Sequence, residues 1–455
     1  MAIDFTLTRE QKALQQTVRE FAQNVLKPVV KAADACADPF EGFQMTREAY
    51  KKAYELGLAF CFIPKEYGGA GTSNIDGLIA SEEICAVDPG FGCTLLVNGL
   101  GLMPLIWWGS EAQKKKFLTR ATSDPDKDFI VGWVVSEPEG TAGFDQPGEH
   151  PVGVQVTADY DAKTDEYVIN GRKMWNSNAP GWDGKGADLN IVVARTDRTK
   201  GGKEGLSVFI VERGTPGFVF EGGLDKMGHR LTIQPRLRFD NLRVPAANLI
   251  EGTKNNGDMA ITKAFTWSGP VAGIAAVGVM RTAFEFALDW SKTFTAGGRT
   301  PIIHHQNVGY MLANMKMKIE AARYLSWRGG HYLDQFDCEG QEVGALSKIY
   351  CGELSVDVIS DAMKLVGINS YLKEYPLEKC MRDALCFQIY DAGNMGMQRR
   401  RLHGMMAHPS YNPMALAHNL KQEFVKAMHG IDSEPGHPVG DTVKTNGHKK
   451  AVATH

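Results

Sequence analysis

The sequence predicts an α+β protein in which a small β domain lies between two helical domains. Three observations support this fold class. Apolar residues recur at helical spacing through about the first 128 positions, the period changes to two from Phe129, and long helical patterns return after Ile250. A chain of 455 residues is also long enough for about two to four domains. We therefore expect an N-terminal helical domain at 1–128, a central β-barrel-like domain at 129–249, a C-terminal four-helix bundle at 250–430 and a flexible tail at 431–455.

Local signals place the helices of the first domain. Thr8 opens a capping box ahead of an apolar run that Pro28 is expected to end. Thr46 is expected to start a second helix, and a glycine-rich turn follows at residues 63–71. Ser110 is placed to cap the last helix of this domain.

The central domain is predicted from alternating and β-rich segments. Residues 152–156 alternate between apolar and polar side chains, and residues 167–171 read as a strand that enters an Asn-Gly turn. Further strands are expected at residues 191–194, 206–211 and 236–245.

The C-terminal domain contains the most informative segment of the chain. Long helices are expected from 308 to 327 and from 343 to 364, followed by an Arg- and Asp-rich helical run that breaks at Asp391 into a glycine-containing turn. Such a break lets a short acid point into a cavity, which suits a general base that must reach a substrate carbon. The alternative is a carboxylate that only closes the helix end.

Composition excludes several function classes. Hydrophobic residues make up 43% of the chain and the net charge is −3, so neither nucleic acid nor an anionic membrane is expected as a partner. No apolar run is expected to reach the roughly 20 residues that span a bilayer. The start of the chain lacks a basic segment followed by an apolar core, so neither secretion nor a mitochondrial presequence is expected. The eight cysteines form no C-x-x-C pair and are expected to be reduced, which predicts a cytoplasmic protein or one of an organelle matrix. No His/Glu spacing suggests a metal.

Several separate motifs resemble the acyl-CoA dehydrogenase family, and the resemblance extends to about Asn419. The matching segments are residues 67–71, 113–116, 135–138, 171–179, 305–306 and 374–391. The resemblance implies the acyl-CoA dehydrogenase fold, an FAD cofactor and an oxidoreductase activity in which a carboxylate removes an acidic C–H proton while electrons pass to the flavin. It also implies a small-molecule substrate, molecular oxygen or an electron-transfer acceptor, and a homotetramer.

The residues around the expected flavin can be assigned partly from chemistry. A flavin ring is a flat, largely apolar disc with a polar edge, and Trp175, Ser136 and Ser177 supply an aromatic neighbour and hydroxyl groups. The family arginine that reaches the FAD phosphate across a subunit interface has no direct counterpart; Arg299 is the candidate, although it also fits a solvated loop. The cofactor-binding residues implied by the resemblance are Val135, Ser136, Trp175, Ser177, Arg299, Gln306, Lys364, Gly367, Gly393 and Asn394.

Three departures from the family pattern bear on the substrate. The Gly-Ser-Asp run is replaced by residues 139–144, the Asp-x-x-Arg pair that anchors coenzyme A falls on residues 266–269, and the base is Asp391 instead of glutamate. These features resemble the nitroalkane oxidases, flavoenzymes on the same fold. That resemblance implies Asp391 as the catalytic base and Ser268 as its contact. A nitro group acidifies the neighbouring carbon far more than a thioester does, so a shorter and weaker base suffices.

One position departs from the nitroalkane oxidase pattern. Those enzymes carry an arginine seven residues after the aspartate, where this chain has Gln398 followed by Arg399, Arg400 and Arg401. Either a one-residue shift lets Arg399 serve, or the substrate differs. Three activities therefore stay open: a nitroalkane oxidase, an acyl-CoA dehydrogenase that uses an aspartate base, and a flavin monooxygenase of the same fold.

Overall fold

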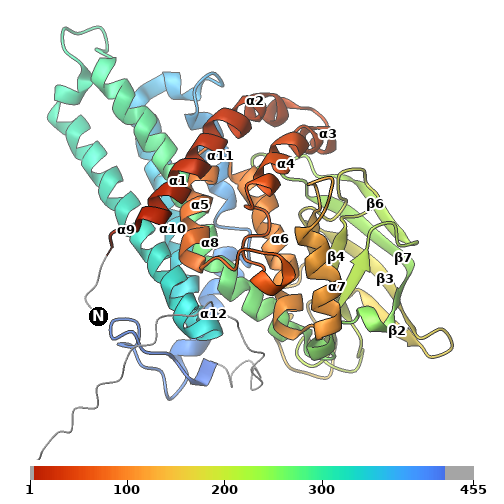
Figure 1. Ribbon diagram of the computed structural model, residues 1–455. Helices are drawn as coiled ribbons and strands as arrows, with labels where there is room; N and C mark the ends of the chain where they lie inside the picture. Colours follow the sequence, from red (N-terminus) through yellow and green to blue (C-terminus); the bar gives the residue numbers. More distant parts are fainter. Residues whose placement is uncertain (1–4, 426–455) are drawn as a thin grey trace, which may run out of the picture.

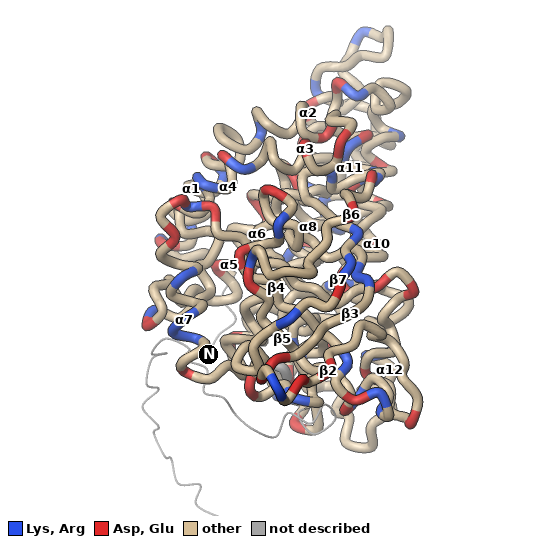
Figure 2. Tube along the Cα trace, turned by 90° about the vertical axis from the view of Figure 1, so that its right-hand side faces the viewer, with Lys and Arg blue, Asp and Glu red and all other residues tan. Residues whose placement is uncertain are grey.

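The computed structural model describes residues 5–425 and confirms the order of helices, strands and helices (Figure 1). The sheet lies on one side of the molecule, and the long helices α9 (Gln306–Phe336) and α10 (Gln341–Val366) lie on the other (Figure 1). The tail expected at 431–455 falls outside the described residues. Residues of both charge signs are spread over the described part of the trace (Figure 2).

The N-terminal domain begins with the predicted caps. Thr8 accepts a hydrogen bond from the backbone of Gln11, and Ser110 accepts one from the backbone of Gln113; both pairs complete a capping box. The elements are α1 (Arg9–Phe21), η1 (Ala22–Leu26), α2 (Lys27–Ala35), α3 (Pro39–Gln44), α4 (Arg47–Glu55), η2 (Lys65–Tyr67), α5 (Asn74–Cys85), α6 (Pro89–Trp108) and α7 (Glu111–Thr122).

Pro28 does not end the first helical run, so that prediction was wrong. The π-helical turn η1 follows α1 directly, and Pro28 lies at the start of α2, immediately after that turn. The chain therefore stays helical as far as Ala35.

The central domain is a single mixed sheet of seven strands within the described residues, in the order β1-β4-β2-β3-β7-β6, with β5 paired to β4. Strand β1 is parallel to β4, whereas β5 runs antiparallel to β4. The strands are β1 (Val131–Val134), β2 (Thr157–Asp161), β3 (Glu166–Met174), β4 (Leu189–Arg195), β5 (Leu206–Glu212), β6 (Phe218–Gly223) and β7 (Pro235–Pro245).

The predicted Asn-Gly turn is instead a β-bulge. Strand β3 continues through Gly171, and its register against β7 shifts between Ile169 and Gly171. Gly171 has a φ of 134°, which only glycine adopts easily, so the dipeptide marks a bulge and not a chain reversal.

The alternating segment 152–156 is not a strand. Its backbone groups are bound by side chains: Arg195 donates to the carbonyls of Val152 and Val154, and the carboxylate of Glu137 accepts from the backbone N–H groups of Gln155 and Val156. These bonds replace the ladder of a sheet, and β2 begins only at residue 157.

The C-terminal domain is helical, with an apolar core shared mainly by α8, α9, α10 and α11. Its elements, with the short turns that lead into it, are η3 (Ala246–Asn248), η4 (Glu251–Thr253), α8 (Gly257–Thr293), η5 (Ile302–His304), α9 (Gln306–Phe336), η6 (Asp337–Gly340), α10 (Gln341–Val366), η7 (Gly367–Tyr371), α11 (Leu377–Cys386), η8 (Gly393–Gln398) and α12 (Arg399–Met406).

Two helices correct the expectation about apolar length. Among the described residues, α6 and α8 are long and apolar enough to cross a membrane, but 83% and 61% of their most apolar windows are buried inside the protein. Core helices pass the same length test, so this observation is weak evidence for a membrane span.

Candidate active site

Asp391 lies where the chain changes direction between α11 and the π-helical turn η8. Asp391 and Ala392 have φ angles of 48° and 70°, the left-handed region that residues other than glycine seldom adopt. Backbone held in this region is typical of sites where a side chain must be aimed, because the surrounding structure has to enforce it. Asp391 is partly buried.

Ser268 of α8 holds the carboxylate of Asp391. Its hydroxyl lies 2.8 Å from Oδ1 and 2.9 Å from Oδ2, and Ser268 itself is fully buried. A hydroxyl has one proton to share between the two oxygens, so the carboxylate keeps lone pairs free to accept a proton from a substrate.

Burial raises the pKa of Asp391, and three groups oppose that rise: the charge of Lys348, the hydrogen bond from Ser268 and the charge of Arg401. Lys348 of α10 donates to the carbonyl of Phe387 and to Oδ1 of Asn394, each at 2.7 Å. Burial lowers the pKa of Lys348 to about 8. With its raised pKa, Asp391 is a stronger base than an ordinary aspartate. The nearby positive charges favour its ionised form, which is the form that can accept a proton.

The three arginines after Gln398 point in different directions. Arg399 donates to both carboxylate oxygens of Glu353, at 2.6 and 2.8 Å, so it does not contact Asp391. The register shift that would bring Arg399 to the base is therefore wrong. Gln398 is buried, and its Nε2 donates to the backbone carbonyl of Asp391 at 3.2 Å.

The structure brings the ends of β1 and β3 together. The side chain of Asn176 joins them: its Oδ1 accepts from the backbone N–H groups of Val135 and Ser136, at 2.8 and 3.0 Å, and its Nδ2 donates to the carbonyl of Ser136. Ser177 accepts a hydrogen bond from Nε2 of Gln234 at 2.8 Å. Asn176 was not among the residues predicted for the site, although it lies inside the motif 171–179 that contains Trp175 and Ser177.

Trp175 offers an aromatic face at this edge. Its backbone has a φ of 71°, its N–H donates to the carbonyl of Pro235, and 52% of the residue is exposed. The left-handed backbone of Trp175 keeps its large apolar ring out of the core. An exposed ring of this kind is suited to contact with a flat ligand. Together with the hydroxyls of Ser136 and Ser177, this donor set fits a flavin ring.

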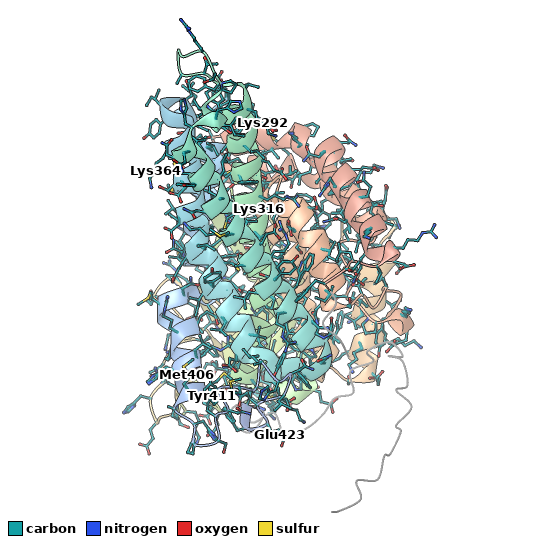
Figure 3. The ribbon with its side chains drawn as sticks, turned by 90° about the vertical axis from the view of Figure 1, so that its left-hand side faces the viewer. Lys292, Lys316, Lys364, Met406, Tyr411 and Glu423 are labelled. Carbon is teal, nitrogen blue, oxygen red and sulfur yellow. The ribbon has the colours of Figure 1, made fainter. Side chains whose placement is uncertain are left out.

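Four residues assigned to the cofactor lie away from Asp391. Arg299 is exposed in the loop after α8, Gln306 begins α9 and donates to the hydroxyl of Tyr310, and Lys364 pairs with Asp361 near the end of α10. Gly367 follows α10 with a φ of 77°. Figure 3 shows Lys364 near one end of the long helices and Met406, the last residue of α12, near the other.

The remaining two assigned residues follow Asp391 directly. Gly393 has a φ of 49° and begins η8. Asn394 is buried, and its amide contacts Lys348, the carbonyl of Ile349 and Glu353. Its side chain is therefore occupied within the protein, and its observed role is to support Lys348.

Sequence reasoning missed Lys348. A signal existed: Lys348 is the single charged residue in the mostly apolar stretch from Val343 to Ile349, and it is buried in the structure. A buried amine needs hydrogen-bond partners or a nearby negative charge, so such a lysine marks a polar site inside a helical core.

A helix–sheet–helix fold with a partly buried carboxylate, and with an exposed aromatic edge that fits a flavin ring, defines a class of flavin-dependent oxidoreductases. Family models for the N-terminal, middle and C-terminal domains of acyl-CoA dehydrogenases match residues 8–124, 134–242 and 255–406. The chain belongs to the acyl-CoA dehydrogenase family and is an FAD-dependent oxidoreductase.

Comparison with individual proteins identifies two kinds of relative. A nitroalkane oxidase of Fusarium oxysporum is 33% identical, with 91% of this chain and 97% of the relative covered. A short-chain-specific acyl-CoA dehydrogenase of Clostridium acetobutylicum is 35% identical, with 88% of this chain and 99% of the relative covered.

Two solved structures of nitroalkane oxidase active-site variants are also similar. One carries an aspartate-to-asparagine change and was crystallised with 1-nitrooctane; the other carries a serine-to-alanine change and was crystallised with 1-nitrohexane. Each has a TM-score of 0.85 and 32% identity, and covers 91% of this chain and 99% of its own.

Proposed function

We propose that this protein oxidises small nitroalkanes, with Asp391 as the base that removes the proton next to the nitro group. The contact between Ser268 and both carboxylate oxygens of Asp391 is the observation that carries the proposal. An aspartate and a serine are also the residues changed in the two similar nitroalkane oxidase structures.

The residues of the chain account for the proton-transfer step. Asp391 takes the proton from the carbon, and the electron pair of that C–H bond moves onto the nitro group to give the nitronate. Ser268 and the positive charges of Lys348 and Arg401 hold the carboxylate in place and keep it ionised before the transfer. Bound FAD supplies the acceptor for the two electrons that leave the substrate.

Coenzyme A substrates form the second candidate, because an acyl-CoA dehydrogenase is as similar to this chain as a nitroalkane oxidase is. The segment that carries the Asp-x-x-Arg pair in coenzyme A-using members reads Thr266, Trp267, Ser268 and Gly269 here. Thr266 and Ser268 are buried and bound to Arg401 and Asp391, so neither side chain is free to hold a long polar ligand. This arrangement favours a small substrate.

Anaerobic mixing of the FAD-loaded protein with nitroethane or with butyryl-CoA separates the two candidates. We expect nitroethane to bleach the flavin absorbance and butyryl-CoA to leave it unchanged. Bleaching by butyryl-CoA alone would overturn the proposal. Bleaching by neither, together with reduction by NADH and a reductase partner, would instead favour the monooxygenase.

We further propose that the protein works as a homotetramer and passes its electrons to molecular oxygen or an electron-transfer acceptor. Lys364 lies about 24 Å along α10 from Lys348, whose charge acts on Asp391, and Gly367 follows the end of the same helix; this supports a cofactor site completed by a second copy. Sedimentation of the FAD-loaded protein tests the assembly, and oxygen consumption with nitroethane tests the acceptor.

A further inference from the structure

Arg401 differs from its two neighbours in having no carboxylate partner of its own. Arg399 is paired with Glu353, and Arg400 is paired with Asp145 at 2.7 Å. No ion pair within 4.0 Å joins Arg401 to a carboxylate among residues 5–425, yet Arg401 is buried whereas the other two are partly exposed. A buried guanidinium without a carboxylate is costly, so its position requires an explanation.

The contacts of Arg401 turn it towards the active site. Its Nη2 donates to the hydroxyl of Thr266 at 2.7 Å and to the carbonyl of Thr262 at 3.0 Å. Its Nη1 donates to Oε1 of Gln398 at 3.3 Å, while its Nε has no hydrogen-bond partner. All these acceptors are neutral, and the positive charge therefore stays available to the surroundings.

Gln398 connects this charge to the backbone of the base. Its Oε1 accepts from Arg401, and its Nε2 donates to the carbonyl of Asp391 at 3.2 Å. The hydrogen bond from Gln398 therefore holds the carbonyl of Asp391, a residue whose backbone is in the left-handed region. A glutamine can pass on orientation in this way but carries no charge of its own.

Charged and titratable groups face the site from several elements. Lys348 of α10 and Arg401 of α12 act on Asp391, while Cys93 of α6 and the adjacent Tyr390 are influenced by its charge. Three charged groups act on Arg401: Asp145, Asp391 and Arg400. Asp145 raises the pKa of Arg401 more than Asp391 does, but Asp145 already forms an ion pair with Arg400. Among residues 5–425, Asp391 is the other carboxylate whose charge acts on Arg401.

We propose that Gln398 and Arg401 together replace the single arginine that nitroalkane oxidases carry seven residues after the aspartate. Gln398 positions the backbone of Asp391, and Arg401, ten residues after the base, supplies the positive charge. Arg401 is thus a positioning residue that acts on Asp391 and does not touch the substrate. The inference rests on the proposed function, because it assigns a role within that same reaction.

The test is Arg401→Gln in the FAD-loaded protein, with nitroethane and its preformed nitronate as separate substrates. Loss of the positive charge leaves Asp391 harder to ionise, so the acidic limb of kcat/KM for nitroethane moves up by about one pH unit. At pH values below the pKa of the base, kcat/KM of the variant should be about tenfold lower than that of the wild type. The nitronate needs no base, and its oxidation stays within about twofold of the wild-type rate. Equal losses on both substrates would overturn the proposal.

Two further variants separate charge from folding. Arg401→Lys keeps the charge and should restore most of the wild-type pH profile, whereas Arg399→Gln, at an arginine paired with Glu353, should leave the profile unchanged. If Arg401→Gln does not fold, Thr266→Val removes the hydroxyl that orients Arg401, and the limb should move in the same direction by a smaller amount. An unmoved limb in Thr266→Val would overturn the proposal.

A titration without substrate distinguishes failure of this inference from failure of the proposed function. The absorbance of bound flavin is followed against pH in the wild type, in Asp391→Asn and in Arg401→Gln. A transition that Asp391→Asn abolishes reports the ionisation of Asp391, and Arg401→Gln should move it to higher pH even if nitroethane is not a substrate. The same midpoint in Arg401→Gln and wild type would refute the role of Arg401.

Discussion

The two ends of the C-terminal helical domain are built differently. At one end, Ser268, Lys348 and Gln398 are buried and hydrogen-bonded around Asp391 within a single chain. At the other end, Arg299 and Lys364 are exposed, and Lys364 pairs with Asp361 three residues before it. One chain thus surrounds the base with buried hydrogen-bonding groups, whereas the residues assigned to the distant part of the cofactor are exposed.

This difference sets the kind of effect that a substitution should have. Charges act strongly on one another where water is excluded, and weakly where water and salt screen them. Changes near Asp391 should therefore alter the pH dependence of the reaction, while changes near Arg299 should alter cofactor retention alone.

The largest effect is expected from Asp391→Asn. The amide keeps the size of the side chain and can still accept from Ser268, but it cannot take a proton. Turnover of nitroethane should fall by about 10²–10⁴-fold while FAD content and circular dichroism stay at wild-type values. Steady-state oxygen consumption measures the loss, and wild-type turnover in this variant would remove Asp391 from the mechanism.

A smaller loss is expected from Ser268→Ala, which deletes the hydroxyl shared by both carboxylate oxygens. Losing a hydrogen bond to a charged group costs about 1.5–3 kcal/mol, or roughly 10- to 100-fold in kcat/KM. The pKa of Asp391 should rise, because that bond favours the ionised form.

A matched control lies on the same helix. Ser291 is buried in α8 and donates to the carbonyl of Leu288, roughly 35 Å along the helix from Ser268. Ser291→Ala should leave kcat/KM and the pH profile unchanged. Equal losses in the two alanine variants would show that Ser268 acts only through helix stability.

Lys348→Met tests the second buried charge. The positive charge of Lys348 lowers the pKa of Asp391, so its removal should raise that pKa and move the acidic limb of kcat/KM to higher pH, by about one unit. The variant also strands the carbonyl of Phe387 and the amide of Asn394, which should cost about 1–3 kcal/mol of unfolding free energy. Urea unfolding and a pH profile measure the two effects, and an unmoved limb would contradict the assigned role.

The smallest effect on turnover is expected from Arg299→Gln. If Arg299 binds the phosphate end of the cofactor, FAD should be lost more readily on dialysis, by about threefold in apparent Kd, with the acidic limb unchanged. Lys292→Gln is a suitable control, because Lys292 is exposed near the same end and pairs with Asp289. Identical FAD retention in the two variants would return Arg299 to the status of a solvated loop residue.

Local signals predicted most of the fold because they act over a few residues. The capping box at Thr8, the helix cap at Ser110 and the strands at 191–194, 206–211 and 236–245 are present as expected. The errors arose where distant groups decided the outcome. Glu137 and Arg195 bind the backbone of 152–156 in place of a neighbouring strand.

For the candidate site, the sequence by itself determined which residue types the chain offers: an aspartate at a helix break, a serine in a helix and a serine-tryptophan edge. Only the tertiary structure decided their partners. Ser268 and Asp391 are 123 residues apart, and the charges of Lys348 and Arg401 act on the same carboxylate from two further helices. Periodicity and caps report on neighbours along the chain, whereas the pKa of a buried acid depends on every charge that folding brings near it.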